Sequence, residues 1–242
     1  MKEYLKTLVW YLTYPLVFYI RYPYSQIRRR RARGVLRAYV DSYDFDEMFG
    51  TETNTPGPNN YGPTQVRVFH EIMEATSSDH QGRVFVDIGA GKGRVALLAC
   101  QRPFKRIIGL ETHFGHLCTA ERNVEQASRK LADTRRIEFQ GTDAYWWVAR
   151  KWPDDPVFLF MYRPFLHSDY RGFFDLVVKQ TSRTRKDCIL AFVNPPLELE
   201  QQLRSRGFGK VAEKGTSLSE VKRVIACWQC FRRSESMGLA DR

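Results

Sequence analysis

The stretch Val84-Phe-Val-Asp-Ile-Gly-Ala-Gly-Lys-Gly-Arg94 decides the fold of this chain, because a short apolar run ends there in a glycine-rich turn. Such an apolar run is typical of a buried parallel strand. Gly89, Gly91 and Gly93 let the backbone approach a ligand without obstruction by Cβ atoms. The apolar residues of 94–100 then predict a helix. The stretch therefore predicts a strand, a ligand-binding turn and a helix in succession.

The spacing of these glycines separates the turn from two other nucleotide-binding motifs. A dinucleotide fingerprint, G-x-G-x-x-G, would place its third glycine at position 94, which is Arg94. A phosphate loop would need a lysine after its last glycine, whereas Lys92 lies inside the glycine run. The motif is G-x-G-x-G, which disfavours nucleotide hydrolysis.

The segment Asp87-Ile-Gly-Ala-Gly-Lys-Gly-Arg94 resembles motif I of the class I methyltransferases. The resemblance covers residues 61 to 230 and extends to uncharacterised bacterial members and, more loosely, to non-SET protein-lysine methyltransferases. It implies an α/β fold with a Rossmann-like seven-stranded methyltransferase sheet, helices on both faces and an antiparallel last strand, together with an N-terminal helical extension. It also implies S-adenosylmethionine as the cofactor.

Further apolar runs predict the remaining strands, at 106–111, 136–144, 157–165, 188–193, 209–214 and 221–228. Helical spacing of apolar residues predicts helices over 113–129 and 168–180. Strands that alternate with helices indicate a parallel sheet with right-handed crossovers. In such sheets ligands bind beyond the carboxyl ends of the strands, so residues at those ends should gather at one edge.

Acidic residues stand at two of these strand ends. Glu111 ends the second strand, and the resemblance implies that it bridges the ribose hydroxyls of the cofactor. Asp87 and the three glycines of the turn would bind the cofactor beside it. Asp143 and Ala144 end the third strand, where the family contacts the adenine amino group. A helix N-cap is the other interpretation of Asp143.

A loop rich in Thr, Asn, Pro and Gly precedes the first helix of the domain and ends in Tyr61-Gly-Pro-Thr64. In the non-SET lysine enzymes a similar element covers the cofactor from the N-terminal side. We therefore expect Tyr61 and Thr64 to contact the cofactor and residues 38–64 to form a linker and lid. The alternative is a surface connection.

The acceptor site is less clearly encoded. Amino-methyltransferases often carry [Asn/Asp/Ser]-Pro-Pro-[Tyr/Phe] after the fourth strand, where this chain has Tyr162-Arg163-Pro164-Phe165. A guanidinium only donates hydrogen bonds, so Arg163 cannot accept one from a substrate amine. Arg163 is a candidate for holding a carboxylate or phosphate, and Tyr162 for orienting the acceptor or packing in the core. Asn194-Pro-Pro-Leu197 follows the fifth strand and is interpreted as its end.

Positive charge is concentrated at the N-terminus. Residues 1–40 hold nine basic residues against Glu3, a net +8 of the total +11. The uncharged stretch Thr7–Ile20 has only 14 residues and contains Pro15, whereas a spanning helix needs roughly 20. Its aromatic residues and the arginines after it favour an in-plane or re-entrant anchor on an anionic membrane. A signal peptide, a helix packed on protein and a nucleic-acid arm are the alternatives.

The predicted organisation is an arm at 1–37, a linker and lid at 38–64, a methyltransferase domain at 65–232 and a polar tail at 233–242. Five cysteines without regular spacing, most of them in apolar segments, suggest reduced thiols and a cytoplasmic location. Cys227 and Cys230 fall on one predicted strand and point to opposite faces. The five histidines are dispersed, so no metal site is predicted.

These observations predict a membrane-associated, S-adenosylmethionine-dependent methyltransferase. Its acceptor is a protein lysine, a lipid-linked molecule or a small metabolite. The alternatives are a noncatalytic S-adenosylmethionine-binding scaffold and an RNA methyltransferase, although the basic charge lies on the arm and not on the predicted catalytic domain.

Overall fold

The structure is a computed structural model of the 242-residue chain. It describes residues 45–54, 61–76, 80–165, 170–195, 198–218 and 221–230. The predicted arm, the polar tail and the lid residues 38–44 and 55–60 lie outside the described residues. Among the helices that are described, none combines the length and the apolar character needed to cross a bilayer.

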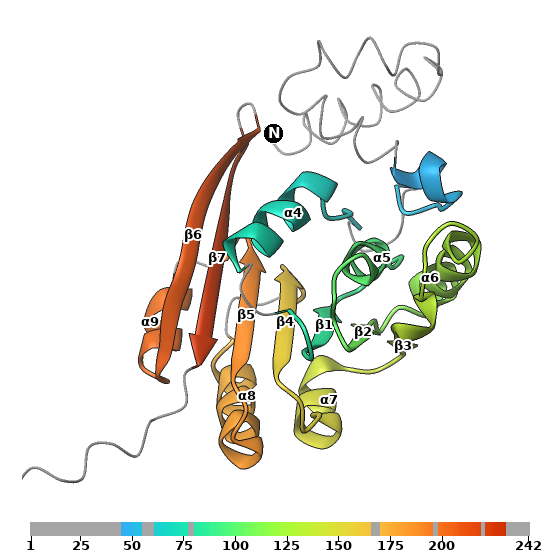
Figure 1. Cartoon of the computed structure of the whole chain (residues 1–242). Helices are drawn as coiled ribbons and strands as arrows, with labels where there is room; N and C mark the ends of the chain where they lie inside the picture. The colour runs from blue at the N-terminus through green and yellow to red at the C-terminus, as the bar shows by residue number, and fades with distance from the viewer. Residues whose placement is uncertain are drawn as a thin grey trace, which may run out of the picture.

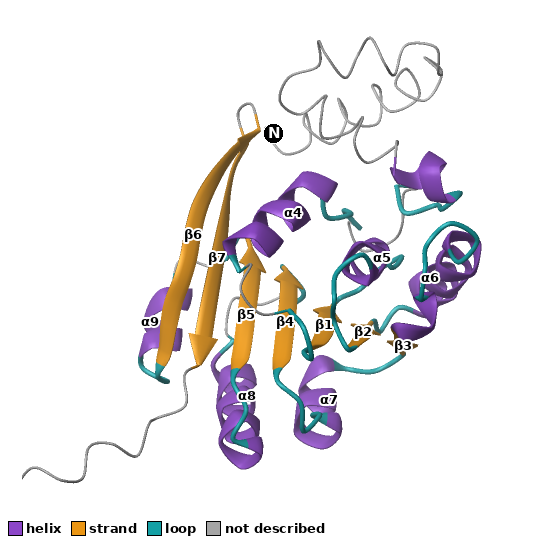
Figure 2. Ribbon diagram, in the orientation of Figure 1, coloured by secondary structure: helices purple, strands orange, loops and turns teal. Residues whose placement is uncertain are grey.

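A seven-stranded sheet in the order β3-β2-β1-β4-β5-β7-β6 forms the middle of the protein (Figure 1). Its strands are β1 (Val84–Ile88), β2 (Arg106–Leu110), β3 (Ile137–Gln140), β4 (Val157–Tyr162), β5 (Cys188–Val193), β6 (Phe208–Leu218) and β7 (Val221–Cys230). Strands β1 to β5 pair in parallel, whereas β7 is antiparallel to both β5 and β6. The arrowheads of β4 and β5 accordingly point opposite to that of β7 (Figure 2).

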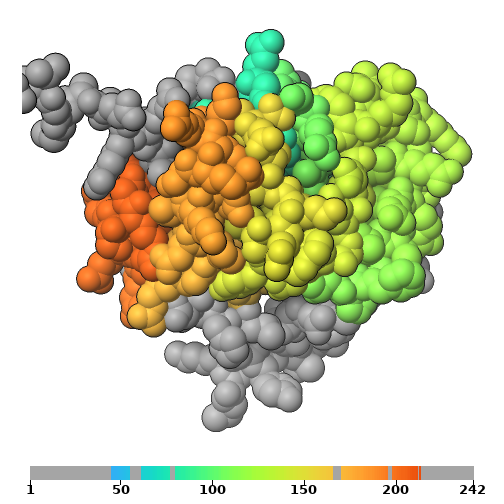
Figure 3. Space-filling view, turned by 90° about the horizontal axis from the view of Figure 1, so that it is seen from below, coloured from blue at the N-terminus to red at the C-terminus, as the bar shows by residue number. Residues whose placement is uncertain are grey.

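Helices cover both faces of this sheet. They are α4 (Val66–Ala75), α5 (Arg94–Cys100), α6 (Phe114–Ala127), α7 (Ala144–Lys151), α8 (Arg171–Thr184) and α9 (Leu199–Arg204). Buried residues of α4, α5 and α6 pack in one apolar cluster, and those of α7, α8 and α9 pack in another. Helices α7 and α8 pack together, and their yellow and orange segments lie side by side in the view from below (Figure 3).

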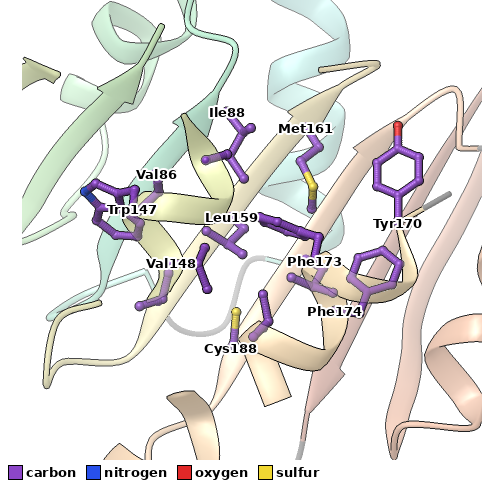
Figure 4. Packing of buried hydrophobic residues seen from close by; sticks show 14 of the residues in the cluster. Val86, Ile88, Trp147, Val148, Leu159, Met161, Tyr170, Phe173, Phe174 and Cys188 are labelled. Carbon is purple, nitrogen blue, oxygen red and sulfur yellow. The ribbon is translucent and has the colours of Figure 1, made fainter. Parts of the chain in front are cut away.

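Successive side chains of β1 point to opposite faces of the sheet, so this one short strand contributes to both apolar clusters. Val84, Val86 and Ile88 point to the α7 and α8 side, whereas Phe85 packs on the α4 and α5 side. Figure 4 shows Val86 and Ile88 with Leu159 and Phe173 in the first cluster. Both faces of the strand are therefore apolar, as expected for a central parallel strand.

The predicted α/β fold with a mostly parallel sheet and helices on both faces is confirmed. Individual bounds differ from the prediction, most clearly for the third strand, which ends at Gln140 and not at Ala144, where α7 begins. A 3-10 turn over Thr134–Arg136 precedes β3, and β4 ends at Tyr162 because Arg163 adopts a left-handed backbone, with φ 49°. Strands β6 and β7 are longer than predicted, because mutual pairing extends them beyond the apolar residues that mark them in the sequence.

Candidate functional site

The glycine-rich turn connects β1 to α5 at the carboxyl edge of the sheet. Gly89, Gly91 and Gly93 have φ values of 78°, 54° and 83°. Residues with a Cβ atom rarely adopt this left-handed region. A Cβ atom at Gly93 would also come within 2.8 Å of the Phe139 ring. The backbone conformation and the close packing therefore both require glycine in this turn.

Asp87 lies directly before the turn and is only 3% exposed. Its Oδ2 atom has no hydrogen-bond partner among the described residues. Burial raises the pKa of Asp87, and the nearby negative charge of Glu111 adds to the effect, so that together they bring it to about 8. A buried carboxyl group in this situation is stabilised as an anion only when a cation or hydrogen-bond donor approaches it.

Glu111 follows β2 and reaches across to the turn. Its Oε2 atom accepts a hydrogen bond from the Gly91 amide at 2.8 Å, and its Oε1 atom accepts one from the His113 amide at 2.7 Å. Because β1 and β2 pair in parallel, the acidic residues at their ends are brought to the same edge. Asp87 and Glu111 therefore form an acidic pair beside the glycine turn.

Residues 45–54 and 61–64, here called the cover segment, pack on this turn from the N-terminal side. The Tyr61 ring lies against Gly91, and its hydroxyl donates to the Thr53 carbonyl at 3.0 Å. The ring also lies 4.9 Å from that of His116, and burial raises the Tyr61 pKa well above its usual range. Thr64 is 5% exposed, and its carbonyl accepts from Arg94 Nη1 at 3.3 Å.

Asp143 caps α7 at the end of β3. Its Oδ1 atom accepts from the Trp146 amide at 3.1 Å, while Ala144, the first residue of the helix, is buried. The helix N-cap considered from the sequence is therefore present. The contact of Asp143 and Ala144 with adenine stays a prediction.

Tyr162 and Arg163 lie where β4 ends, and Pro164 packs close to Gly89. Tyr162 is partly buried and packs against the α4 and α5 cluster, whereas Arg163 is exposed. Burial raises the pKa of Tyr170, and the positive charge of Arg163 opposes that rise, so the two side chains are neighbours.

The end of the neighbouring strand β5 has the same backbone feature as the end of β4. Tyr162 pairs with Val193, and the residue directly after each strand, Arg163 and Asn194 respectively, has a positive φ, 49° and 55°. Such conformations cost free energy in non-glycine residues and are enriched at functional sites.

Several residues of this region have roles that the sequence did not indicate. In the sequence, Arg94 indicated only that the glycine motif is not a dinucleotide fingerprint. In the structure, its side chain is buried and hydrogen-bonded to the cover segment. Asn123 of α6 also connects the turn to that segment. His116 is 6% exposed, and its Nε2 atom has no hydrogen-bond partner in the described part of the chain. No sequence pattern points to Asn123 or His116 as neighbours of the turn.

Cysteine and histidine are side chains that commonly hold transition metals in proteins. The described ranges contain no cluster of three or more His, Cys, Asp or Glu side chains able to hold a metal ion. His113 and His116 pack ring against ring at 4.5 Å, and His113 Nδ1 accepts a hydrogen bond from the His116 amide. Their contact is thus part of the start of α6.

Solved structures that are similar to this chain include several methyltransferases. PH1948 from Pyrococcus horikoshii, a proposed RNA methyltransferase, aligns with a TM-score of 0.57 at 14% identity, over 80% of this chain and 98% of its own. The METTL16 methyltransferase domain aligns with a TM-score of 0.56 at 17% identity, over 79% of each chain. The chain has the class I methyltransferase fold. A precorrin-6y C5,15-methyltransferase from Geobacter metallireducens shares this methyltransferase fold, with a TM-score of 0.52 at 17% identity over 77% of this chain and 95% of its own.

The neighbours with this methyltransferase fold differ in the substrates that their names give, so the fold leaves the acceptor open. No protein-family model matches the sequence, and no curated protein matches it significantly. The case for a particular function consequently rests on the site itself.

Proposed function

We propose that the chain is an S-adenosylmethionine-dependent methyltransferase. The observation that carries this proposal is the buried, incompletely bonded carboxyl of Asp87 beneath a turn of three left-handed glycines. A ligand with permanent positive charge and several donors suits this acidic site, and Glu111 provides a second carboxylate beside Asp87. The residues present therefore fit the sulfonium cofactor.

Within this proposal each residue has a binding or positioning role. The cofactor supplies an activated methyl group on its sulfonium sulfur. Asp87 and the glycine turn would hold its charged part, Glu111 its ribose, and Asp143 with Ala144 its adenine. Tyr61 and Thr64 would cover it. Transfer of this kind depends mainly on aligning the acceptor with the methyl group, so an enzyme of this class needs no nucleophile of its own.

The acceptor would bind at the ends of β4 and β5. Arg163 is exposed there, next to Tyr170, and is suited to a carboxylate or phosphate of the acceptor. Protein lysines, lipid-linked molecules and small metabolites remain the proposed classes, with an acidic group near the methylated atom. An RNA acceptor would make binding fall steeply with salt, because phosphate contacts release counterions.

The arm at 1–37 would place the enzyme on an anionic membrane surface facing the cytoplasm. The support for this proposal is the sequence alone, with its aromatic stretch followed by Arg28 to Arg31. No contact in the described part of the chain is used to support this membrane proposal.

Calorimetric titration with S-adenosylmethionine, NAD and ATP tests the central proposal. Micromolar binding of the first ligand alone is expected, and radiolabelled methyl transfer to membrane and soluble extracts would then identify the acceptor. Binding without transfer to any extract would favour the noncatalytic scaffold. No binding of S-adenosylmethionine would overturn the proposal.

A further inference from the structure

The first half of the cover segment is organised around one carboxylate. Asp46 lies on the short helix at 45–49, and its Oδ1 atom accepts from the Thr51 hydroxyl at 2.7 Å and from the Thr53 hydroxyl at 2.5 Å. The amides of Thr53 and Asn54 donate to the same carboxylate at 3.0 and 2.8 Å. These bonds fold residues 46–54 into a compact loop.

Arg94 joins this loop to the glycine turn. It is the first residue of α5, directly after Gly93, and is 2% exposed. Its Nε atom donates to the Thr53 hydroxyl at 2.7 Å, and its Nη2 atom lies 3.6 Å from Asp46 Oδ2. Its Nη1 atom donates to the Thr64 carbonyl at 3.3 Å, so one guanidinium contacts both halves of the cover segment.

Two further sets of contacts also join the cover segment to the glycine turn. The Tyr61 hydroxyl donates to the Thr53 carbonyl, which puts the ring on Gly91. Asn123 donates to the Lys92 carbonyl and accepts from the Glu52 amide, both at 2.9 Å. The cover segment and the turn are therefore bonded to each other through the buried side chains of Arg94 and Asn123 and the partly buried Tyr61.

Burying a guanidinium is costly unless its donors are satisfied, and its planar fork cannot be replaced by the single ammonium of lysine. We infer that Arg94 is a positioning residue that locks the cover segment onto the glycine turn, so that Tyr61 closes the site where the cofactor binds. The inference rests on the proposed function for the identity of the ligand. The lock itself is a property of the ligand-free chain.

Amide exchange of the ligand-free full-length protein tests the lock directly. Arg94→Lys keeps the charge but loses the fork, and Thr53→Val removes the bridging hydroxyl at nearly constant volume. In each variant the amides of Thr53 and Asn54 should exchange about tenfold faster or more. Affinity for S-adenosylmethionine should fall by a similar factor. Arg106→Lys is the matched control, because among the described residues the Arg106 side chain forms only an exposed ion pair, with Glu138, at the amino end of β2.

The two proposals fail in different ways. If the wild-type protein does not bind S-adenosylmethionine, the proposed function is wrong, and amide exchange still decides whether the lock exists. If Arg94→Lys and Thr53→Val lower the melting temperature but leave both exchange at 53–54 and cofactor affinity as in the wild type, Arg94 only supports the fold and the inference is overturned.

Discussion

The ring of Tyr61 lies so close to Gly91 that a Cβ atom on the glycine would come within 2.4 Å of Tyr61 Cε2. Gly91→Ala should therefore displace the ring and strain a backbone with φ 54°. We expect a loss of about 1 to 2 kcal/mol in the free energy of unfolding and a fall of about tenfold or more in cofactor affinity. Chemical denaturation and calorimetric titration measure the two effects.

Gly82→Ala is the control for this variant. Gly82 has φ 80°, but a Cβ atom there would meet nothing within 4 Å. Gly82→Ala should lower the free energy of unfolding by an amount similar to that of Gly91→Ala and leave cofactor affinity unchanged. Equal affinities for the two variants would show that the contact between Tyr61 and Gly91 does not matter for binding.

Glu111 has a structural role in addition to the proposed ribose contact. Glu111→Ala leaves the amides of Gly91 and His113 without their acceptor and should cost about 1 to 2 kcal/mol of stability. Glu111→Gln keeps an oxygen acceptor, so it should melt closer to the wild type while binding the cofactor about tenfold more weakly. Wild-type affinity in both variants would remove Glu111 from the proposed binding site.

Asp87 makes the ligand-free protein sensitive to pH. Its folded-state pKa, about 8, lies above that of an unfolded carboxyl, about 4. Between these values the unfolded chain has lost the proton that the folded chain keeps. The contribution of Asp87 to the free energy of unfolding should therefore be highest below about pH 4. It should fall as pH rises from about 4 to about 8.

Asp87→Asn should flatten this pH dependence and stabilise the ligand-free protein at pH 8 by about 1 to 3 kcal/mol, because no charge is then buried. The same change should weaken cofactor binding, since the carboxylate no longer compensates the positive ligand. Thermal melting across pH and calorimetry measure these opposite effects. The exposed residue Asp154 offers the control Asp154→Asn, for which neither quantity should change. A destabilised Asp87→Asn would contradict the assignment of a buried, uncompensated carboxyl.

The sequence predicted the strand and turn at 84–93 because local requirements coincide there. A buried strand needs an apolar run, and left-handed turns need glycine, so both leave a direct trace in the sequence. Glu111 could be placed beside the turn because parallel strands end at the same edge of a sheet.

The contacts of Arg94, Thr53 and Asn123 could not be predicted in the same way. Arg94 and Thr53 are 41 residues apart, and Asn123 and Glu52 are 71 apart. Side chains that meet over such separations follow from packing, which no periodicity or short motif encodes. Asp143 illustrates a different limit, because its acidic side chain suits a helix N-cap and a ligand contact equally well from the sequence.

The arm offers a prediction that the sequence alone supports. The full chain should float with vesicles that contain anionic lipid, and a chain lacking 1–37 should not, because the aromatic stretch and arginines would be missing. Neutral vesicles serve as the control and should retain less protein. Flotation of both chains would place the membrane contact in the domain, and salt-sensitive RNA binding by the arm in place of flotation would favour a nucleic-acid role.

Arg163 and Arg185 provide a matched pair for testing the acceptor site. Both have left-handed backbones, with φ 49° and 53°, but Arg163 follows β4 at the proposed site whereas Arg185 ends α8. Replacement of either by glycine should change the free energy of unfolding by no more than about 1 kcal/mol, since relief of strain is offset by the freedom of glycine in the unfolded chain. Only Arg163→Gly should reduce methyl transfer, measured with radiolabelled cofactor, while cofactor affinity stays unchanged. Full transfer by Arg163→Gly would exclude the guanidinium as an acceptor-binding group and leave its strained backbone without a functional explanation.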